Sequence, residues 1–288
     1  MRKILQNLFH RFRSNSNAMD IGVKKSEVTI SELEPWRILT KDMPSRSREL
    51  FDILRNKWCE VPAGLADRKN TNEFQYMSDR ELTQFWSRAL EEATTGEGFK
   101  VRGWFHHLYS DILTGKKVLD VGSGLGLDGI TFARNGAKVT FVDIVLDNLE
   151  TVKRLCENLA IKDVDFLHME DFDSLERLPN DFDVIWCQGS MINAPYEFMR
   201  RECSVLLNHL KVGGRWIELC YPRERWVREG KLAFNEWGKV TDGESTPWME
   251  WYDLDRLLKR MQPSEFEVLL HFNFHNDDFN WFDLIKKN

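Results

Sequence analysis

KVLDVGSGLG, from Lys117 to Gly126, is the stretch that decides the fold. Its first half is a short apolar and β-branched run, which predicts a buried strand. Three alternating glycines follow, and glycine lets the backbone turn tightly and approach a ligand closely because it has no Cβ. A helical pattern to Ala137 and a second apolar run over 138–143 complete a strand-loop-helix-strand unit. We expect this unit to hold a small molecule.

The spacing of the glycines distinguishes between three kinds of ligand site. A dinucleotide site of the form G-x-G-x-x-G would need glycine where Leu127 stands. A phosphate-binding P-loop would need Gly-Lys-Ser/Thr, and no such triplet follows. What remains is Asp120 before the glycines and Asp143 at the end of the next strand. This pattern resembles the class I S-adenosylmethionine-dependent methyltransferases.

The resemblance implies an α/β fold, a doubly wound, mostly parallel seven-stranded sheet of the Rossmann-like methyltransferase kind. It also implies an antiparallel terminal hairpin, which the alternating run 266–274 and the run 279–285 fit. The chain then divides into an amphipathic segment and linker (1–30), a helical extension or lid (31–115) and a methyltransferase domain (116–288). An insertion is expected at about 221–251.

The expected cofactor is S-adenosylmethionine. A carboxylate at Asp143 can accept two hydrogen bonds from vicinal ribose hydroxyls, a strong bidentate arrangement. Asp120 adds negative charge near the cationic amino and sulfonium groups. We expect the backbone of the loop to lie against the methionine tail and the ribose, through Gly122, Ser123, Gly124 and Gly126.

The adenine side is inferred from the resemblance alone. There an acid after the third strand accepts from the adenine amino group, and we choose Asp171, with Glu170 as its rival. Ile144 and Phe172 are the expected apolar clamps. Gln188 follows the fourth strand, 182–187, and we expect it at the crevice where strand order reverses.

Acceptor-side candidates are fewer. Tyr221 and His275 are the candidates for catalytic or acceptor-side roles, although a surface role is favoured for each. The helix over 101–112 offers Arg102, Trp104 and Tyr109 to the methionine end, with packing against the sheet as an equal alternative. No metal site is expected, and the sequence also lacks the motifs typical of DNA-base methylation.

Two features of the insertion bear on the acceptor. Trp226, Trp237, Trp248 and Trp251 could stack on a sugar, although aromatic residues pack cores more often. The polar run 241–247 contains an Asp-Gly turn signal and predicts an exposed loop. Two runs, PWMEWYD over 247–253 and HNDDFNWFD over 275–283, resemble methyltransferases that modify sugars or surface glycans.

Helix starts can be predicted from capping residues. Ser78 followed by Glu81 is a capping box ahead of an apolar helical pattern, and Asp147 followed by Glu150 predicts another start. Helices are also predicted over 47–58 and 196–210.

Composition limits the function classes. The chain of 288 residues has a net charge of −6 and lacks a broad basic field, which disfavours nucleic-acid binding. Its five cysteines are odd in number and without C-x-x-C spacing, so we expect buried thiols and a cytoplasmic location. Residues 1–13 are basic and amphipathic, which allows weak membrane-surface contact, although a loosely docked helix is favoured.

These features together predict methyl transfer from S-adenosylmethionine to an oxygen or nitrogen of a small-molecule acceptor, with a saccharide or surface-glycan precursor as one such acceptor. Two alternatives stay open. One is a catalytically inactive cofactor-binding subunit, and the other is an RNA or protein methyltransferase recruited by another chain.

Overall fold

The computed structural model describes residues 48–63 and 68–288, which all belong to one compact unit. The predicted amphipathic segment 1–13 lies outside the described residues. Within them, no helix combines the length and the apolar character that crossing a membrane requires.

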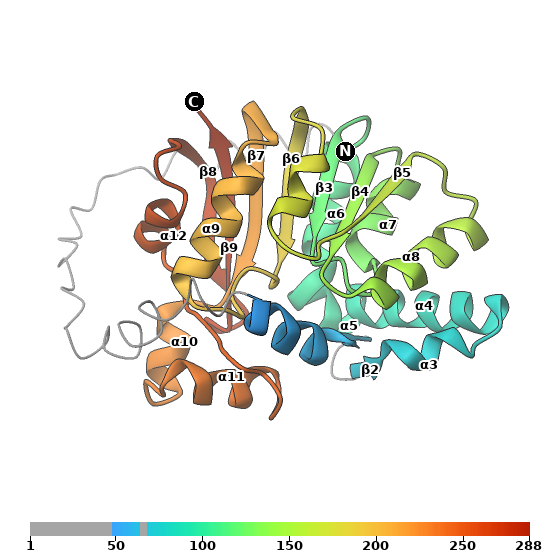
Figure 1. Ribbon diagram of the computed structural model, residues 1–288, viewed down its shortest axis with the longest axis horizontal. Helices are drawn as coiled ribbons and strands as arrows, with labels where there is room; N and C mark the ends of the chain where they lie inside the picture. Colours follow the sequence, from blue (N-terminus) through green and yellow to red (C-terminus); the bar gives the residue numbers. More distant parts are fainter. Residues whose placement is uncertain (1–47, 64–67) are drawn as a thin grey trace. The chain divides into compact units, whose positions relative to one another are not determined.

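A seven-stranded sheet forms the centre of this unit, in the order β5-β4-β3-β6-β7-β9-β8 (Figure 1). Neighbouring strands from β5 to β7 run parallel, whereas β9 is antiparallel to β7 and to the edge strand β8. The predicted doubly wound sheet and terminal hairpin are therefore confirmed. The strands are β3 (Lys117–Val121), β4 (Lys138–Asp143), β5 (Val164–His168), β6 (Phe182–Gln188), β7 (Leu210–Cys220), β8 (Phe266–Phe274) and β9 (Phe279–Lys286).

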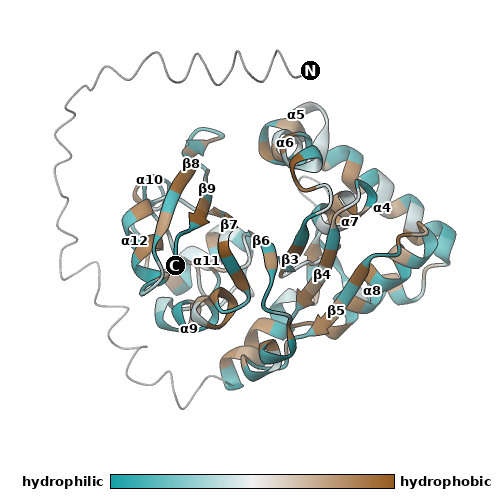
Figure 2. Ribbon diagram, turned by 90° about the horizontal axis from the view of Figure 1, so that it is seen from above, coloured by the Kyte–Doolittle hydropathy of each residue, from teal (hydrophilic) through white to brown (hydrophobic). Residues whose placement is uncertain are grey.

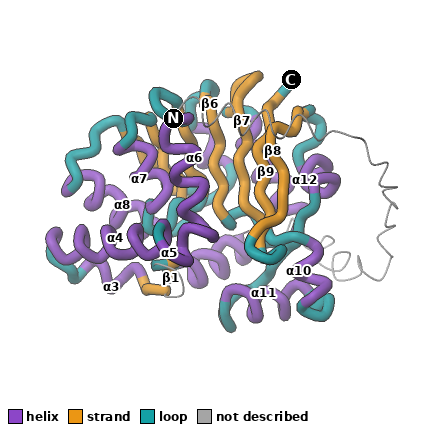
Figure 3. Tube along the Cα trace, turned by 180° about the vertical axis from the view of Figure 1, so that it is seen from behind, coloured by secondary structure: helices purple, strands orange, loops and turns teal. Residues whose placement is uncertain are grey.

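Helices cover both faces of the sheet. α9 (Tyr196–Leu207) lies in front of the strands in Figure 1, whereas α6 (Trp104–Ile112) lies in front of them in the reverse view of Figure 3. Each face has its own hydrophobic core, one joined by α9 and α12 (Leu254–Arg260) and the other by α6. Figure 2 shows that α4 carries both apolar and polar residues along its length, as expected for a helix with one face packed and the other exposed.

The remaining elements surround this sheet. They are a helix over 48–58, β1 (Glu60–Pro62), β2 (Arg68–Asn70), α3 (Thr71–Gln75), α4 (Asp79–Thr94), α5 (Gly96–Gly98), a π-helix (Phe99–Gly103), α7 (Leu127–Arg134), α8 (Leu146–Asn158), the 3-10 helix η2 (Asp173–Arg177), α10 (Arg223–Arg228) and α11 (Phe234–Asp242). The short pair β1–β2 was not predicted.

The capping box predicted ahead of α4 is present. The Ser78 hydroxyl accepts from the Glu81 N–H, and the Glu81 carboxylate accepts from the Ser78 N–H at 2.8 Å. Such a cap contributes about 1 kcal/mol to helix stability. The π-helix that precedes α6 passes very close to α4, since a Cβ at Gly103 would lie 2.2 Å from the Thr94 carbonyl oxygen.

Two local predictions were wrong. α8 begins one residue before Asp147, with Val145 at the N-cap and no side-chain cap. The polar run 241–247 is not a single exposed loop, because α11 extends through Asp242, whose side chain is only 11% exposed. Residues 243–245 alone are exposed there.

The aromatic residues of the insertion pack inward. Trp226, Trp237, Trp248 and Trp251 are all buried. Three of their indole N–H groups are satisfied within the fold, by Leu232, Glu229 and Glu250. The five cysteines are free thiols, of which Cys59 alone is not buried.

Candidate functional site

A cavity of about 500 Å³ lies where the parallel strands end. It is bounded by the segments after β3, β4 and β6, and β3 and β6 are the pair at which the strand order reverses. Open α/β sheets bind ligands at this point. The helix over 48–58, the start of β2 and the end of α11 complete the wall.

The glycine loop forms the floor of the cavity. Gly122 has φ +73°, and a Cβ there would lie 2.4 Å from the Ser190 Cβ, so any larger residue clashes with the segment after β6. Gly124 also has positive φ, at +51°. Its N–H points to the neighbouring strand end and donates to the Asp143 carboxylate at 3.0 Å.

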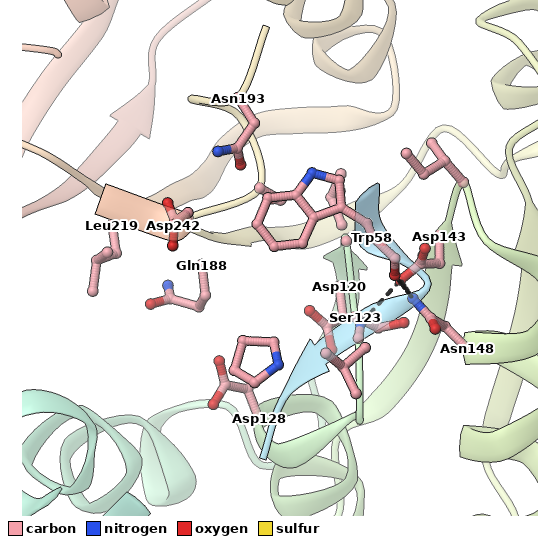
Figure 4. A pocket seen from close by; sticks show the side chains of 18 of the residues that line it. Trp58, Asp120, Ser123, Asp128, Asp143, Asn148, Gln188, Asn193, Leu219 and Asp242 are labelled. Carbon is pink, nitrogen blue, oxygen red and sulfur yellow. Dashed lines mark hydrogen bonds between the residues drawn. The ribbon is translucent and has the colours of Figure 1, made fainter. Parts of the chain in front are cut away.

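Asp143 is fixed by three donors. Besides Gly124, the Val145 N–H donates at 2.9 Å and the Asn148 amide at 3.3 Å. Burial raises the pKa of Asp143 to about 6, although these hydrogen bonds oppose the rise. Asn148 also donates to the Trp58 carbonyl at 3.1 Å, which ties the helix over 48–58 to this side of the cavity (Figure 4).

Two further buried carboxylates, Asp128 and Asp120, line the cavity near the glycine loop. Asp128, at the start of α7, accepts from Arg102 at 3.1 Å and from the Trp186 indole at 3.0 Å, and it contacts His106. Burial favours its neutral form, but Arg102 and His106 outweigh burial and hold the pKa of Asp128 well below its usual range. The pKa of Asp120 is raised, first by burial and then by the nearby charge of Asp128.

In the part of the cavity beside the glycine loop, several buried polar atoms have no partner among the described residues. They are Asp120 Oδ2, the Ser123 and Ser190 hydroxyls, Asn148 Oδ1 and both amide atoms of Gln188. Buried polar groups are rarely left unpaired, because each costs about 1–3 kcal/mol. The set therefore indicates a polar ligand.

The opposite wall carries a different group of side chains. In Figure 4, Gln188, Leu219 and Asp242 lie on the side away from Asp143 and Asn148. Asp242 pairs with Arg68, and the Tyr221 hydroxyl donates to it at 3.3 Å. Burial raises the pKa of Asp242, although the charges of Arg68 and Arg225 oppose the rise.

Most predicted residues line the cavity, and some do not. Those that line it are Asp120, Gly122, Ser123, Gly124, Asp143, Ile144, Gln188, Tyr221 and Arg102. Gly126 is the left-handed residue before α7, with φ +68°. Trp104 packs against Trp281, and Tyr109 donates to Asp283 at 2.6 Å, so both belong to the core beside the sheet.

Asp171, Phe172 and His275 lie outside the cavity lining. The Asp171 carboxylate is exposed and accepts from the Ser174 N–H at 3.0 Å, in the turn just before η2. Phe172 is buried against Phe198, with ring centroids 4.8 Å apart. His275 lies in the turn of the terminal hairpin and contacts Asp278 at 2.9 Å.

Sequence reasoning missed several lining residues. The sequence pattern predicts Asn148 as part of a helix start, and the turn signal after Asp242 predicts an exposed residue there. Asp128 and Glu202 lie within helical patterns. A single buried carboxylate within an apolar helix face would have been a usable signal for Glu202. Within the described ranges, no group of three or more His, Cys, Asp or Glu residues could hold a metal ion.

Comparisons with known proteins agree with this architecture. Residues 118–214 match a family model described as a methyltransferase domain. A ubiquinone biosynthesis O-methyltransferase of Neisseria meningitidis is 34% identical over 134 residues, which cover 46% of this chain and 56% of that protein. One of Idiomarina loihiensis is 36% identical over 95 residues, covering 33% of this chain and 39% of that protein. The chain thus spans about half the length of the curated relatives it matches, or less.

Solved structures support the fold. Magnesium protoporphyrin IX methyltransferase from Synechocystis, solved with bound SAH (S-adenosylhomocysteine), aligns with a TM-score of 0.50 at 17% identity, over 88% of this chain and 99% of that chain. A protein of Pyrococcus horikoshii aligns with a TM-score of 0.52 at 14% identity, over 68% and 93% of the two chains. At these identities the likeness concerns the fold alone.

Proposed function

We propose that this chain, which carries a class I S-adenosylmethionine-dependent methyltransferase domain, transfers the methyl group of that cofactor to a hydroxyl oxygen of a small molecule. The observation that carries the proposal is the division of one cavity into two halves. One half offers unpartnered polar atoms beside a glycine loop, and the other offers a largely buried carboxylate.

The first half fits the cofactor. Asp143 would accept from the ribose hydroxyls, and the Asn148 Oδ1 atom beside it lacks a partner among the described residues. Asp120 Oδ2 and Gln188 would bind the amino end of the methionine moiety, whose positive charge would favour the ionised form of Asp120. When bound, S-adenosylmethionine supplies an activated methyl group on a sulfonium centre.

The second half fits an acceptor that must lose a proton. A neutral hydroxyl is a poor nucleophile until a base takes its proton. Asp242 would accept that proton, and its raised pKa brings it closer to the neutral range in which a general base is most effective. Tyr221 and Arg68, which both contact Asp242, would hold the carboxylate in position.

The names of the relatives favour oxygen over nitrogen as the methylated atom, since the matched proteins are O-methyltransferases. A saccharide acceptor gains no support from the cavity. The four tryptophans of the insertion, which could have stacked on a sugar, are buried and do not line it. A small hydroxyl compound is the acceptor class that we propose.

Transfer of radiolabelled methyl groups tests this function. The protein would be incubated with methyl-labelled S-adenosylmethionine and, in separate reactions, with catechol, 3,4-dihydroxybenzoate, methyl α-glucoside, tRNA and casein. We expect label in a hydroxyl compound and none in tRNA or casein. Label in the macromolecules alone would contradict the proposal, and binding of the cofactor without transfer to any pool would favour a catalytically inactive subunit.

A further inference from the structure

Glu202 is an ionisable cavity residue that neither half of the site uses. It lies on α9, lines the cavity and is only 5% exposed. Across the described ranges, no hydrogen bond or ion pair reaches its carboxyl group. A largely buried carboxyl group is costly unless a hydrogen-bond partner satisfies it, and here the cavity is the side from which a partner can come. Such a group is therefore a candidate for binding a ligand.

Apolar residues line the cavity on the same helix as Glu202 and on the helix over 48–58. Phe198 and Met199 come from the preceding turn of α9, and Phe51 and Leu54 come from the helix over 48–58. The Phe198 ring packs on the Phe51 ring with centroids 5.2 Å apart. We call this part of the cavity, which contains Glu202 and these four apolar residues, the α9 lobe. Apolar walls with a carboxyl group suit a flat heterocycle with a polar edge.

The lobe continues from the place of Asp143. Ile144, the next residue, lines it, and the Met169 N–H donates to the Asp143 carbonyl at 2.9 Å, so Met169 borders it as well. A base attached to a ribose at Asp143 would enter between these residues. The acid expected to bind the base, Asp171, is held by Ser174 outside the lining.

We propose that the Glu202 carboxyl group binds the amino edge of the cofactor's adenine. The protonated carboxyl would donate its O–H to the ring nitrogen N1 and accept an N–H from the 6-amino group, which makes two hydrogen bonds with one side chain. The inference rests on the proposed function, because it concerns how the same cofactor is bound.

The charges around Glu202 permit the protonated form. Arg260 from α12 and Glu218 from β7 face it, but they form an ion pair with each other. Among the described residues, the thiols of Cys187 on β6 and Cys203 on α9 also interact with Glu202. Burial raises the pKa of Glu202 to about 7, so a substantial fraction is protonated at neutral pH.

Calorimetry tests the inference by comparing the affinity for S-adenosylhomocysteine with the affinity for an analogue that lacks only the 6-amino group. The parent protein should bind the analogue roughly tenfold more weakly, the effect of one lost hydrogen bond in a buried site. Glu202→Leu should bind both ligands with nearly equal affinity. Glu202→Gln should retain the discrimination, because an amide offers the same donor and acceptor.

A pH series separates Glu202 from the other acids of the site. Between pH 6 and 8.5 the ratio of parent affinity to Glu202→Gln affinity should fall, because only the parent loses its proton. Glu197→Gln, on the exposed side of the same helix, should behave as the parent does. An equal analogue penalty in the parent and in Glu202→Leu, or a pH-independent ratio, overturns the inference. If the parent binds no S-adenosylhomocysteine, the proposed function itself fails.

Discussion

The two halves of the cavity are assembled in different ways. The cofactor half comes mostly from one continuous stretch, since the glycine loop, Asp143 and Asn148 all fall within 117–148, and Gln188 and Ser190 join it from the end of β6 and the segment after it. The acceptor half draws on Arg68, Tyr221 and Asp242, from three separate parts of the chain. Local backbone geometry therefore defines the first half, whereas tertiary packing of an insertion defines the second. The difference implies that cofactor binding and acceptor chemistry can be lost independently.

The largest expected effect concerns the acceptor half. Asp242→Asn removes the proposed base but keeps the shape of the side chain. Turnover of the hydroxyl acceptor should fall by about 10²–10⁴, the usual contribution of a general base. Affinity for S-adenosylmethionine, measured calorimetrically, should stay within about twofold of the parent value, because the base contributes in the transition state.

Glu244→Gln is the matched control for Asp242→Asn, since it lies two residues further on and is exposed. Unchanged turnover in Asp242→Asn, or equal losses in the two variants, would remove Asp242 from the mechanism.

A backbone change in the cofactor half should have the next largest effect. Gly122→Ala puts a methyl group at φ +73° and 2.4 Å from the Ser190 Cβ. Strain of about 1–3 kcal/mol at such positions, together with displacement of the segment after β6, should weaken cofactor affinity by about 10-fold or more. Calorimetric titration with S-adenosylmethionine measures this loss of affinity.

Gly115→Ala supplies the comparison for Gly122→Ala. Gly115 has a similar φ of +72°, but a Cβ there meets nothing within 4 Å and the residue does not line the cavity. It should lower the melting temperature without changing cofactor affinity. A loss of affinity in both variants would mean that global destabilisation, and not the loop, explains the effect.

The pH dependence of cofactor binding provides a third way to separate the halves. Burial raises the pKa of Asp143 to about 6, so the carboxylate becomes protonated below that value. A protonated Asp143 cannot accept both ribose hydrogen bonds. In Glu202→Gln, which removes the other titrating carboxyl group of the base site, affinity should fall as pH decreases from 6.5 to 5, by up to tenfold per unit. A flat profile there would contradict the role of Asp143.

A smaller effect is expected for Asn148→Ala. The change deletes the hydrogen bonds to Asp143 and to the Trp58 carbonyl, which hold the carboxylate and the helix over 48–58 in place. Affinity for S-adenosylmethionine should fall by about 3–10-fold, since each such bond contributes about 1 kcal/mol. Glu150→Ala, exposed on the same helix, should have no effect.

The difference between the two halves of the cavity also explains which features could be predicted from the sequence. The sheet, its terminal hairpin and the glycine loop follow from hydrophobic periodicity and from spacing within short windows. The acceptor half could not be predicted, because Arg68 and Asp242 meet only after residues far apart in sequence have folded together. Asp242 was also misread, since the Asp-Gly signal marks a turn but does not show which side of the turn is buried. The adenine side was inferred by analogy, and the structure places Asp171 outside the lining and Glu202 within it.

The central claim is that the end of β4, beside the glycine loop, binds an adenosyl cofactor. Calorimetric titration of S-adenosylmethionine into the parent protein and into Asp143→Ala tests it most directly. We expect saturable binding to the parent and a loss of about 100-fold or more in the variant, as expected when a charge-assisted bidentate contact is removed. No heat of binding to the folded parent, or equal affinity in both proteins, would contradict the account.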